Sequence, residues 1–250
     1  MRTMPRKGKP LEVGLPGRLE AAISLIPETA VSVVDIGYDH GYALIELARR
    51  SSEIELFGVE RIAGAARRFY SDPSAVPFLR RIRLLDGDGF APVANHRFDA
   101  AIIAGMGEES IIAICQRHPD LRRCVERVVA CSPQMPAILR PAFAELGYGV
   151  QDERLAYDGR RYYEVIAFHR DVEPSTDPLA LLFGPHLLRD SRLEPYLTER
   201  RRHWEALLQR ESARLVPRAE WPPPRPGHAG AFQRLKARAL DAARRRMRGH

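Results

Sequence analysis

The stretch Val31-Ser-Val-Val-Asp-Ile-Gly-Tyr-Asp-His-Gly-Tyr42 joins an apolar, β-branched run to an acidic residue and a glycine-spaced turn, and a helical pattern comes next over residues 43–48. This order is typical of a buried parallel strand that leads through a tight turn into a helix N-terminus. Glycines let a backbone approach a ligand closely, and a helix start offers unpaired N–H groups. The stretch therefore predicts the nucleotide-cofactor site of a doubly wound α/β sheet around Gly37 and Gly41.

A second strand is expected over residues 54–59, and it ends at Glu60, 23 residues after Gly37. Folds of this class place a carboxylate near this position, where it accepts hydrogen bonds from both ribose hydroxyls. The alternative is a solvated glutamate at the end of a strand. The order of strand, glycine turn, helix, strand and acid favours the binding role.

The spacing of the turn indicates which cofactor it would bind. A dinucleotide fold requires G-x-G-x-x-G, whose middle glycine leaves room for the pyrophosphate. Here the turn reads Asp35-x-Gly37-x-Asp39-x-Gly41, so a carboxylate lies where the phosphates would be and would repel them. S-adenosylmethionine (SAM) has no phosphate, and it carries an ammonium and a sulfonium. We therefore predict SAM rather than NAD.

The 250 residues, 45% of them hydrophobic, suffice for one large domain plus an appendage. No run approaches 18 apolar residues, so we expect no membrane span. Residues 1–15 are basic and lack an apolar region, which predicts a disordered arm rather than a signal peptide. Cys115, Cys124 and Cys131 lack C-x-x-C spacing, and we expect thiols in a reducing cytoplasm, with neither disulfide nor metal.

Charge is distributed unevenly along the chain. Residues 173–250 hold 16 Lys+Arg against 9 Asp+Glu, whereas residues 1–172 hold 23 of each, so the net charge of +7 lies in the last third. This asymmetry indicates an anionic partner, with nucleic acid the first candidate. The alternative is a solvated helix surface in a chain that uses 36 Arg against 3 Lys.

The remaining patterns predict three further strands at residues 82–85, 98–104 and 125–131, and two further helices at residues 63–70 and 108–116. A closing hairpin is expected from residues 148–155 and 162–169, which flank the turn Asp158-Gly159. Five βα units plus a hairpin make an α/β, Rossmann-like, seven-stranded class I methyltransferase domain over residues 16–172. Helical spacing over 193–215 and 232–247, separated by a proline-rich loop, predicts a basic, coiled-coil-like helical hairpin within residues 173–250.

Several segments together resemble the bacterial tRNA (adenine-N1) methyltransferases that modify position 22, the TrmK family. Residues 35–42 are close to the family's D-I-G-S-D-H-A-Y, Gly87-Asp-Gly89 fits G-D-G-L, and residues 103–107 match I-A-G-M-G. The resemblance covers roughly residues 18–215. It implies SAM-dependent methylation of tRNA, with the C-terminal helices helping to hold the RNA, in a cytoplasmic protein that we expect to be a monomer.

We expect the cofactor to bind at the ends of the first four strands, through Asp35, Gly37, Asp39, His40, Gly41, Glu60, Arg61, Asp88, Gly89, Ala104, Gly105 and Met106. Glu60 would hold the ribose hydroxyls, and Asp88 would lie near the adenine amino group. Adenine N1 already has a lone pair, so catalysis would come from alignment and from a carboxylate that stabilises the alkylated base. Asp39 is the candidate carboxylate, with Tyr42 as a stacking or hydrogen-bonding wall. Asp39 could equally bind the cofactor's amino group or cap the helix, and His40 fits a structural hydrogen-bond partner better than a base.

The chain departs from the family pattern at several positions. Tyr38 replaces serine, Gly41 replaces alanine, Glu108 replaces the second glycine of G-M-G-G, and residues 132–134 read Ser-Pro-Gln instead of Q-P-N. Glu108 and Gln134 would lie where the methyl acceptor enters. Three functions therefore stay open: a tRNA base methyltransferase, a SAM enzyme with a small-molecule or protein acceptor, favoured by Glu108, and a non-catalytic RNA-binding module.

Overall fold

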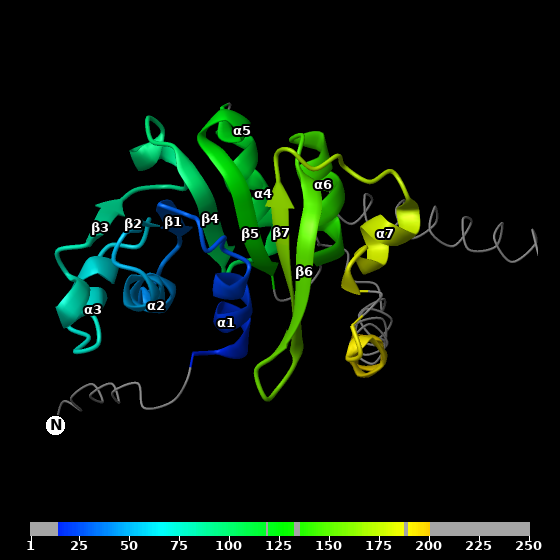
Figure 1. Ribbon diagram of the computed structural model, residues 1–250, viewed down its shortest axis with the longest axis horizontal. Helices are drawn as coiled ribbons and strands as arrows, with labels where there is room; N and C mark the ends of the chain where they lie inside the picture. Colours follow the sequence, from blue (N-terminus) through cyan, green and yellow to red (C-terminus); the bar gives the residue numbers. More distant parts are fainter. Residues whose placement is uncertain (1–14, 119, 133–135, 188–189, 201–250) are drawn as a thin grey trace, which may run out of the picture.

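The computed structural model describes residues 15–118, 120–132, 136–187 and 190–200 (Figure 1). Its strands are β1 (Ser32–Ile36), β2 (Glu55–Glu60), β3 (Ile82–Asp86), β4 (Phe98–Ala104), β5 (Val125–Ser132), β6 (Gly149–Tyr157) and β7 (Tyr162–His169). Its helices are α1 (Gly17–Ser24), α2 (Tyr42–Arg50), α3 (Ala65–Tyr70), α4 (Glu108–Gln116), α5 (Leu121–Cys124), α6 (Leu139–Glu145) and α7 (Pro178–Phe183). Short 3-10 turns are η1 (Val76–Phe78), η2 (Ala91–Val93) and η3 (Pro136–Ile138).

The strands of the described residues form one sheet in the order β3-β2-β1-β4-β5-β7-β6. β1 to β5 are parallel, and β7 pairs antiparallel with both β5 and β6. The strand order reverses between β1 and β4, and ligands of open α/β sheets bind beyond the carboxyl ends of the strands at such a point. The expected seven-stranded Rossmann-like fold is confirmed.

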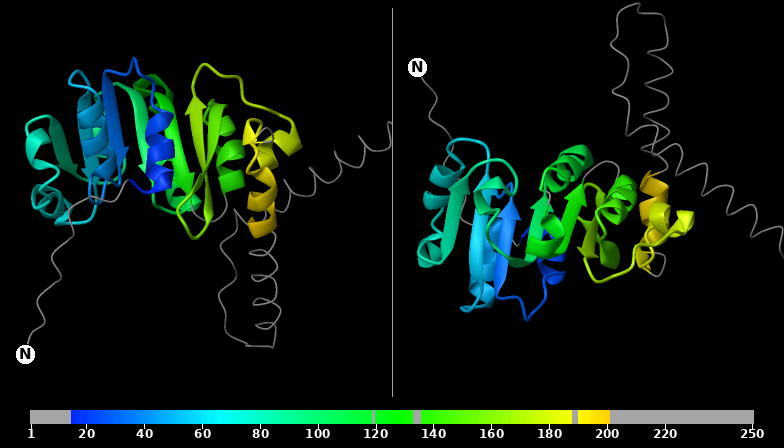
Figure 2. Two further views of the ribbon diagram at one scale, coloured as in Figure 1. Left: turned by 60° about the horizontal axis from the view of Figure 1, so that its bottom comes forward. Right: turned by 90° about the horizontal axis from the view of Figure 1, so that it is seen from above.

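Helices cover both faces of the sheet (Figure 2). Alternate residues of a strand point to opposite faces, so Val33 of β1 joins the core beneath α1, α2 and α3, whereas Val34 joins the core beneath α4, α5 and α6. Ile102 and Ile103 of β4 divide in the same way, and both are fully buried. A parallel strand covered on both faces requires such a continuous apolar sequence.

The expected elements lie within a few residues of the observed ones, and one shift bears on function. β2 extends to Glu60, so this carboxylate belongs to the strand itself and is buried, not solvated after the strand end. The hairpin of β6 and β7 turns at Asp158-Gly159, as predicted, with Gly159 at φ 86°.

The C-terminal region adds α7 and a helical segment at residues 193–200, which lie beside β6 and α6 at the end of the sheet (Figure 1). Leu187 and Tyr196 form a small core with Leu155 of β6. Residues 1–14 and 201–250, and with them most of the predicted arm and hairpin, lie outside the described residues. Among the described residues, no helix has the length and apolarity to cross a membrane.

Candidate active site

A cavity of about 710 Å³ lies beyond the carboxyl ends of β1, β2, β3 and β4. Of the residues expected at the site, it is lined by Asp35, Gly37, Asp39, His40, Tyr42, Glu60, Arg61, Asp88, Gly89, Ala104, Gly105 and Met106. Residues from four separate segments thus meet at the switch point between β1 and β4.

The two glycines of the β1–α2 turn have different surroundings. Gly37 has φ 80°, and a Cβ there would lie 2.7 Å from Cε of Met106 in the loop after β4. Gly41 has φ 71°, and a Cβ there would overlap the ring of Phe69 in α3. Gly41 does not line the cavity and packs against α3, so its expected contact with cofactor stays a prediction.

Two carboxylates lie side by side at the ends of β1 and β2. Burial, together with the charge of Glu60, raises the pKa of Asp35 to about 7. Oε1 of Glu60 accepts hydrogen bonds from the backbone N–H groups of Arg61 at 2.8 Å and Ile62 at 2.9 Å. Among the described residues no donor bonds Oε2 of Glu60, which is therefore free to accept from a ligand. A ligand with hydroxyls and a positive charge fits this pair.

The rim of the cavity holds Asp39, His40 and Tyr42. Asp39 has φ 48°, in the left-handed region that favours glycine, and its exposed carboxylate accepts a hydrogen bond from Nη2 of Arg68 at 2.9 Å. The rings of His40 and Tyr42 stack, with centroids 5.3 Å apart and an interplanar angle of 8°. Partial burial raises the pKa of Tyr42, with smaller contributions from Asp72 and Asp39, so its phenol stays protonated and can donate. Asp39 and Tyr42 thus both lie beside the cavity, as predicted.

Other lining residues were not predicted from the sequence. α4 contributes Ser110, Ala113 and Ile114, Arg117 caps the end of α4, and α1 contributes Arg18 and Leu19. Nη2 of Arg117 lies 3.0 Å from Oδ2 of Asp88, so the carboxylate expected near the cofactor's adenine also holds a cation. The spacing of 110, 113, 114 and 117 is that of one helix face, which is the sequence signal that could have identified this wall.

The expectation that Glu108 faces the incoming acceptor is wrong. Its side chain is buried, does not line the cavity, and accepts a 2.8 Å hydrogen bond from Oγ of Ser132. A carboxylate in the first turn of α4 is also favoured by the helix dipole. Gln134, the other residue expected at the acceptor mouth, lies outside the described residues.

The cysteines lie apart from the cavity lining, and all three are free thiols. Burial raises the pKa of Cys115 and of Cys131 to about 12, so neither is a thiolate near neutral pH. In the part of the chain that the structure describes, no group of His, Cys, Asp and Glu is arranged to hold a metal ion.

The seven-stranded Rossmann-like fold and the cavity at its switch point are those expected of a methyltransferase, and comparison with known proteins agrees. A family model described as a methyltransferase domain matches residues 15–166, and the chain belongs to this family. A particular relative is the tRNA (adenine(22)-N(1))-methyltransferase of Bacillus subtilis (strain 168), 27% identical over 185 residues that cover 72% of this chain and 77% of that protein. The resemblance to the TrmK family is thus confirmed.

Two solved structures share the fold. TrmK of M. capricolum, in complex with S-adenosyl-homocysteine, has a TM-score of 0.68 at 19% identity and covers 89% of this chain and 95% of its own. TrmK of B. subtilis has a TM-score of 0.66 at 20% identity and covers 94% of this chain and 96% of its own. Each alignment covers a larger share of this chain than the matched family domain does.

Proposed function

We propose that this chain is a SAM-dependent methyltransferase that methylates N1 of an adenine in tRNA. The observation that carries the proposal is that the segments resembling the TrmK motifs, distant in sequence, line one cavity at the switch point of the sheet. The similarity to the B. subtilis tRNA methyltransferase supports the acceptor.

The residues of the cavity fit SAM. We assign Oε2 of Glu60 to the ribose hydroxyls and Asp88 to the adenine end, as the strand positions predict. The buried Asp35 would gain a cation when the methionine ammonium binds nearby. At Gly105 a Cβ would meet nothing within 4 Å, so the backbone there is open to the cavity. Bound SAM supplies an electrophilic methyl group.

On the acceptor side, the stacked pair of His40 and Tyr42 offers a flat surface for a base, and the protonated Tyr42 phenol offers a donor. N1 attacks through its own lone pair, so the protein needs no base and must chiefly hold the adenine in line. Asp39 lines the cavity and would stabilise the developing positive charge, but its carboxylate is exposed and shared with Arg68. We therefore assign most of the catalytic effect to alignment and a smaller part to Asp39.

Arginines at the rim of the cavity are candidates for contact with a polyanionic acceptor. Arg18, Arg61 and Arg117 line the cavity beside four carboxylates, and Arg117 and Arg68 are paired with Asp88 and Asp39. Arginines bind phosphates by releasing condensed counterions, and an adenine in a paired region must be flipped out to reach the cavity. The main support for a different acceptor was Glu108 at the mouth, and the buried position of Glu108 removes that support.

The test is methyl transfer from labelled SAM by the full-length protein, with unmodified tRNA offered beside protein and small-molecule fractions. We expect label in tRNA alone. Glu60→Gln should abolish most transfer, whereas Glu55→Gln is the matched control, because Glu55 is exposed at the opposite end of the same strand. Label in protein or in small molecules would contradict the proposal, and absence of label in every fraction despite SAM binding would favour a non-catalytic module.

A further inference from the structure

Arg18 lies in the first turn of α1 and lines the cavity, and its side chain contacts the hairpin of β6 and β7. Its Nη1 lies 3.7 Å from Oδ2 of Asp158 in the turn of the hairpin, and its guanidinium carbon lies 5.5 Å from the centre of the Tyr163 ring. α1 packs closely on the hairpin, because a Cβ at Gly17 would lie 2.8 Å from the backbone oxygen of Tyr157. The hairpin therefore fixes where the charge of Arg18 meets the cavity.

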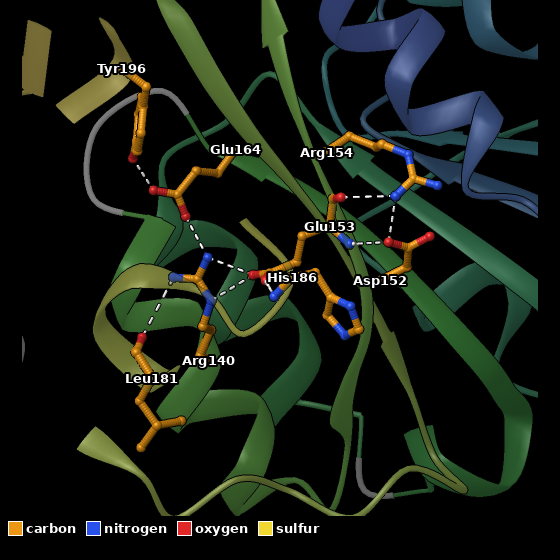
Figure 3. Close-up of polar contacts among 8 residues, drawn as sticks. All are labelled: Arg140, Asp152, Glu153, Arg154, Glu164, Leu181, His186 and Tyr196. Carbon is orange, nitrogen blue, oxygen red and sulfur yellow. Dashed lines mark hydrogen bonds and ion pairs between the residues drawn. The ribbon is translucent and has the colours of Figure 1, made fainter. Parts of the chain in front are cut away.

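The N–H groups of the Arg18 guanidinium lack acceptors. The side chain is only 31% exposed, yet it donates no hydrogen bond to any described residue, since 3.7 Å is too long for a hydrogen bond to Asp158. Arg140 binds the same hairpin and differs in this respect, because its guanidinium donates to the buried carboxylates of Glu153 and Glu164 (Figure 3). Half-buried donors without acceptors are costly. The donors of Arg18 therefore indicate a ligand with an acceptor in the cavity.

The position of Arg18 indicates which part of the cofactor it would meet. The other two arginines of the cavity lie at the end assigned to adenosine, since Arg61 follows Glu60 and Arg117 pairs with Asp88. α1, by contrast, contacts β4, β5, β6 and β7 (Figure 1). Arg18 therefore reaches the cavity from the side of β4 and β5, across the switch point from the adenosine end. The methionine part of SAM would extend toward that side.

The methionine part of SAM carries a carboxylate as well as an ammonium. Asp35 suits the ammonium, but the carboxylate would enter a cavity that is already lined by the carboxylates of Asp35, Asp39, Glu60 and Asp88. Like charges repel, so the carboxylate of the cofactor requires a cation of its own. A guanidinium group matches a carboxylate with two parallel hydrogen bonds.

We propose that Arg18 binds the carboxylate in the methionine part of SAM, and that Asp158 is a positioning residue that holds the Arg18 side chain. The inference rests on the SAM binding of the proposed function and is independent of the acceptor. It assigns Arg18 to the cofactor rather than to the phosphates of tRNA. The turn of the β6–β7 hairpin thus takes part in cofactor recognition, although Asp158 does not line the cavity.

The test compares two ligands that differ only in this carboxylate, S-adenosyl-homocysteine and its decarboxylated analogue, which keeps the ammonium. Calorimetry on the full-length protein gives both dissociation constants. The wild type should bind S-adenosyl-homocysteine at least about tenfold more tightly, because hydrogen bonds between charged groups are strong. Arg18→Gln should lose most of this preference. Arg61→Gln is the matched control, because it removes the same charge from the adenosine end and should keep the preference.

A second arm asks whether Asp158 acts through Arg18. Asp158→Asn should reduce the preference by a smaller factor than Arg18→Gln does, and it should change nothing further when it is added to Arg18→Gln. An unchanged preference in Asp158→Asn, or a further loss in the double variant, would overturn the positioning role of Asp158.

Two results would overturn the role of Arg18. One is equal affinity of the wild type for the two ligands, a comparison that needs no variant and stands even if Arg18→Gln fails to fold. The other is a preference that survives Arg18→Gln, which would assign the carboxylate to backbone N–H groups at the start of α2. Failure of the wild type to bind either ligand would instead overturn the proposed function, so the two failures are distinguishable.

Discussion

Oγ of Ser132, at the end of β5, donates a 2.8 Å hydrogen bond to Oε2 of Glu108, the first residue of α4. The two residues are 24 positions apart, and both are buried. The bond joins the carboxyl end of β5 to the start of the helix that follows β4. The Glu108 carboxylate, which the sequence places in the path of the substrate, is therefore a structural link.

Replacing Glu108 should affect stability rather than methyl transfer. Glu108→Ala leaves the Ser132 hydroxyl without its acceptor, and the free energy of unfolding should fall by about 1–3 kcal/mol. Glu108→Gln keeps an acceptor and should lie close to wild type. Urea denaturation measures both, and methylation per folded molecule should stay unchanged. A rise in methyl transfer to adenine in Glu108→Ala, with unchanged stability, would restore the view that the side chain obstructs entry.

SAM binding should depend on pH through Asp35. Because the pKa of Asp35 is raised from 3.8 to about 7, the free protein is partly protonated there at neutral pH. A cationic ligand favours the ionised form, so SAM affinity should increase as pH rises from 6 to 8 and then level off. Calorimetry at several pH values measures this, with Asp35→Asn as the variant that lacks the dependence. An identical pH profile in Asp35→Asn would assign the titration to another group.

The same shift predicts a pH effect on folding. The folded pKa of Asp35 exceeds the unfolded value, so the native state retains a proton that the unfolded chain releases between about pH 4 and pH 7. Stability contributed by this group is therefore lost as pH rises through that window. Asp35→Asn, which cannot ionise, should raise the Tm of the SAM-free protein at pH 8 and change it little at pH 4. A lower Tm at pH 8 would show that the Asp35 charge is compensated within the protein.

Arg140 should be among the most sensitive positions for stability. Arg140→Met leaves Glu153 and Glu164 buried without their cation, and such losses cost about 3–5 kcal/mol. Arg49→Met is the control, because Arg49 forms an exposed pair with Glu46, and surface pairs contribute about 0–1 kcal/mol. Chemical denaturation compares the two. Equal losses in the free energy of unfolding would mean that the buried contacts of Arg140 with Glu153 and Glu164 stabilise the fold no more than an exposed ion pair does.

The local patterns of the sequence predict the strands and the glycine turn well. The strand at residues 98–104, apolar except for Asp99, and the run before Asp35 can be recognised in the sequence because a strand covered on both faces needs a mostly apolar sequence. The same logic places Glu60 at the end of β2, since parallel strands present their carboxyl ends at one edge of the sheet.

Contacts between polar residues that are distant in the sequence cannot be predicted from such local patterns. Arg117 with Asp88, and Ser132 with Glu108, depend on how α4 packs against the sheet, and neither pair has a spacing rule in sequence. Gly41 has a packing reason to lack a side chain that the sequence does not reveal, because a Cβ there would overlap the ring of Phe69 in the next helix. The partners of these residues are decided by tertiary packing, and the local sequence pattern does not contain that information.

Mapping methylated nucleosides in tRNA decides whether this protein methylates adenine N1 at position 22. Unmodified tRNA with adenine at position 22 is incubated with the full-length protein and SAM, and mass spectrometry of nuclease fragments locates any added methyl group. We expect 1-methyladenosine at position 22, and no methylation of the same tRNA with guanine at that position. Methylation of another base or atom, or equal methylation of both tRNAs, would contradict the proposed function.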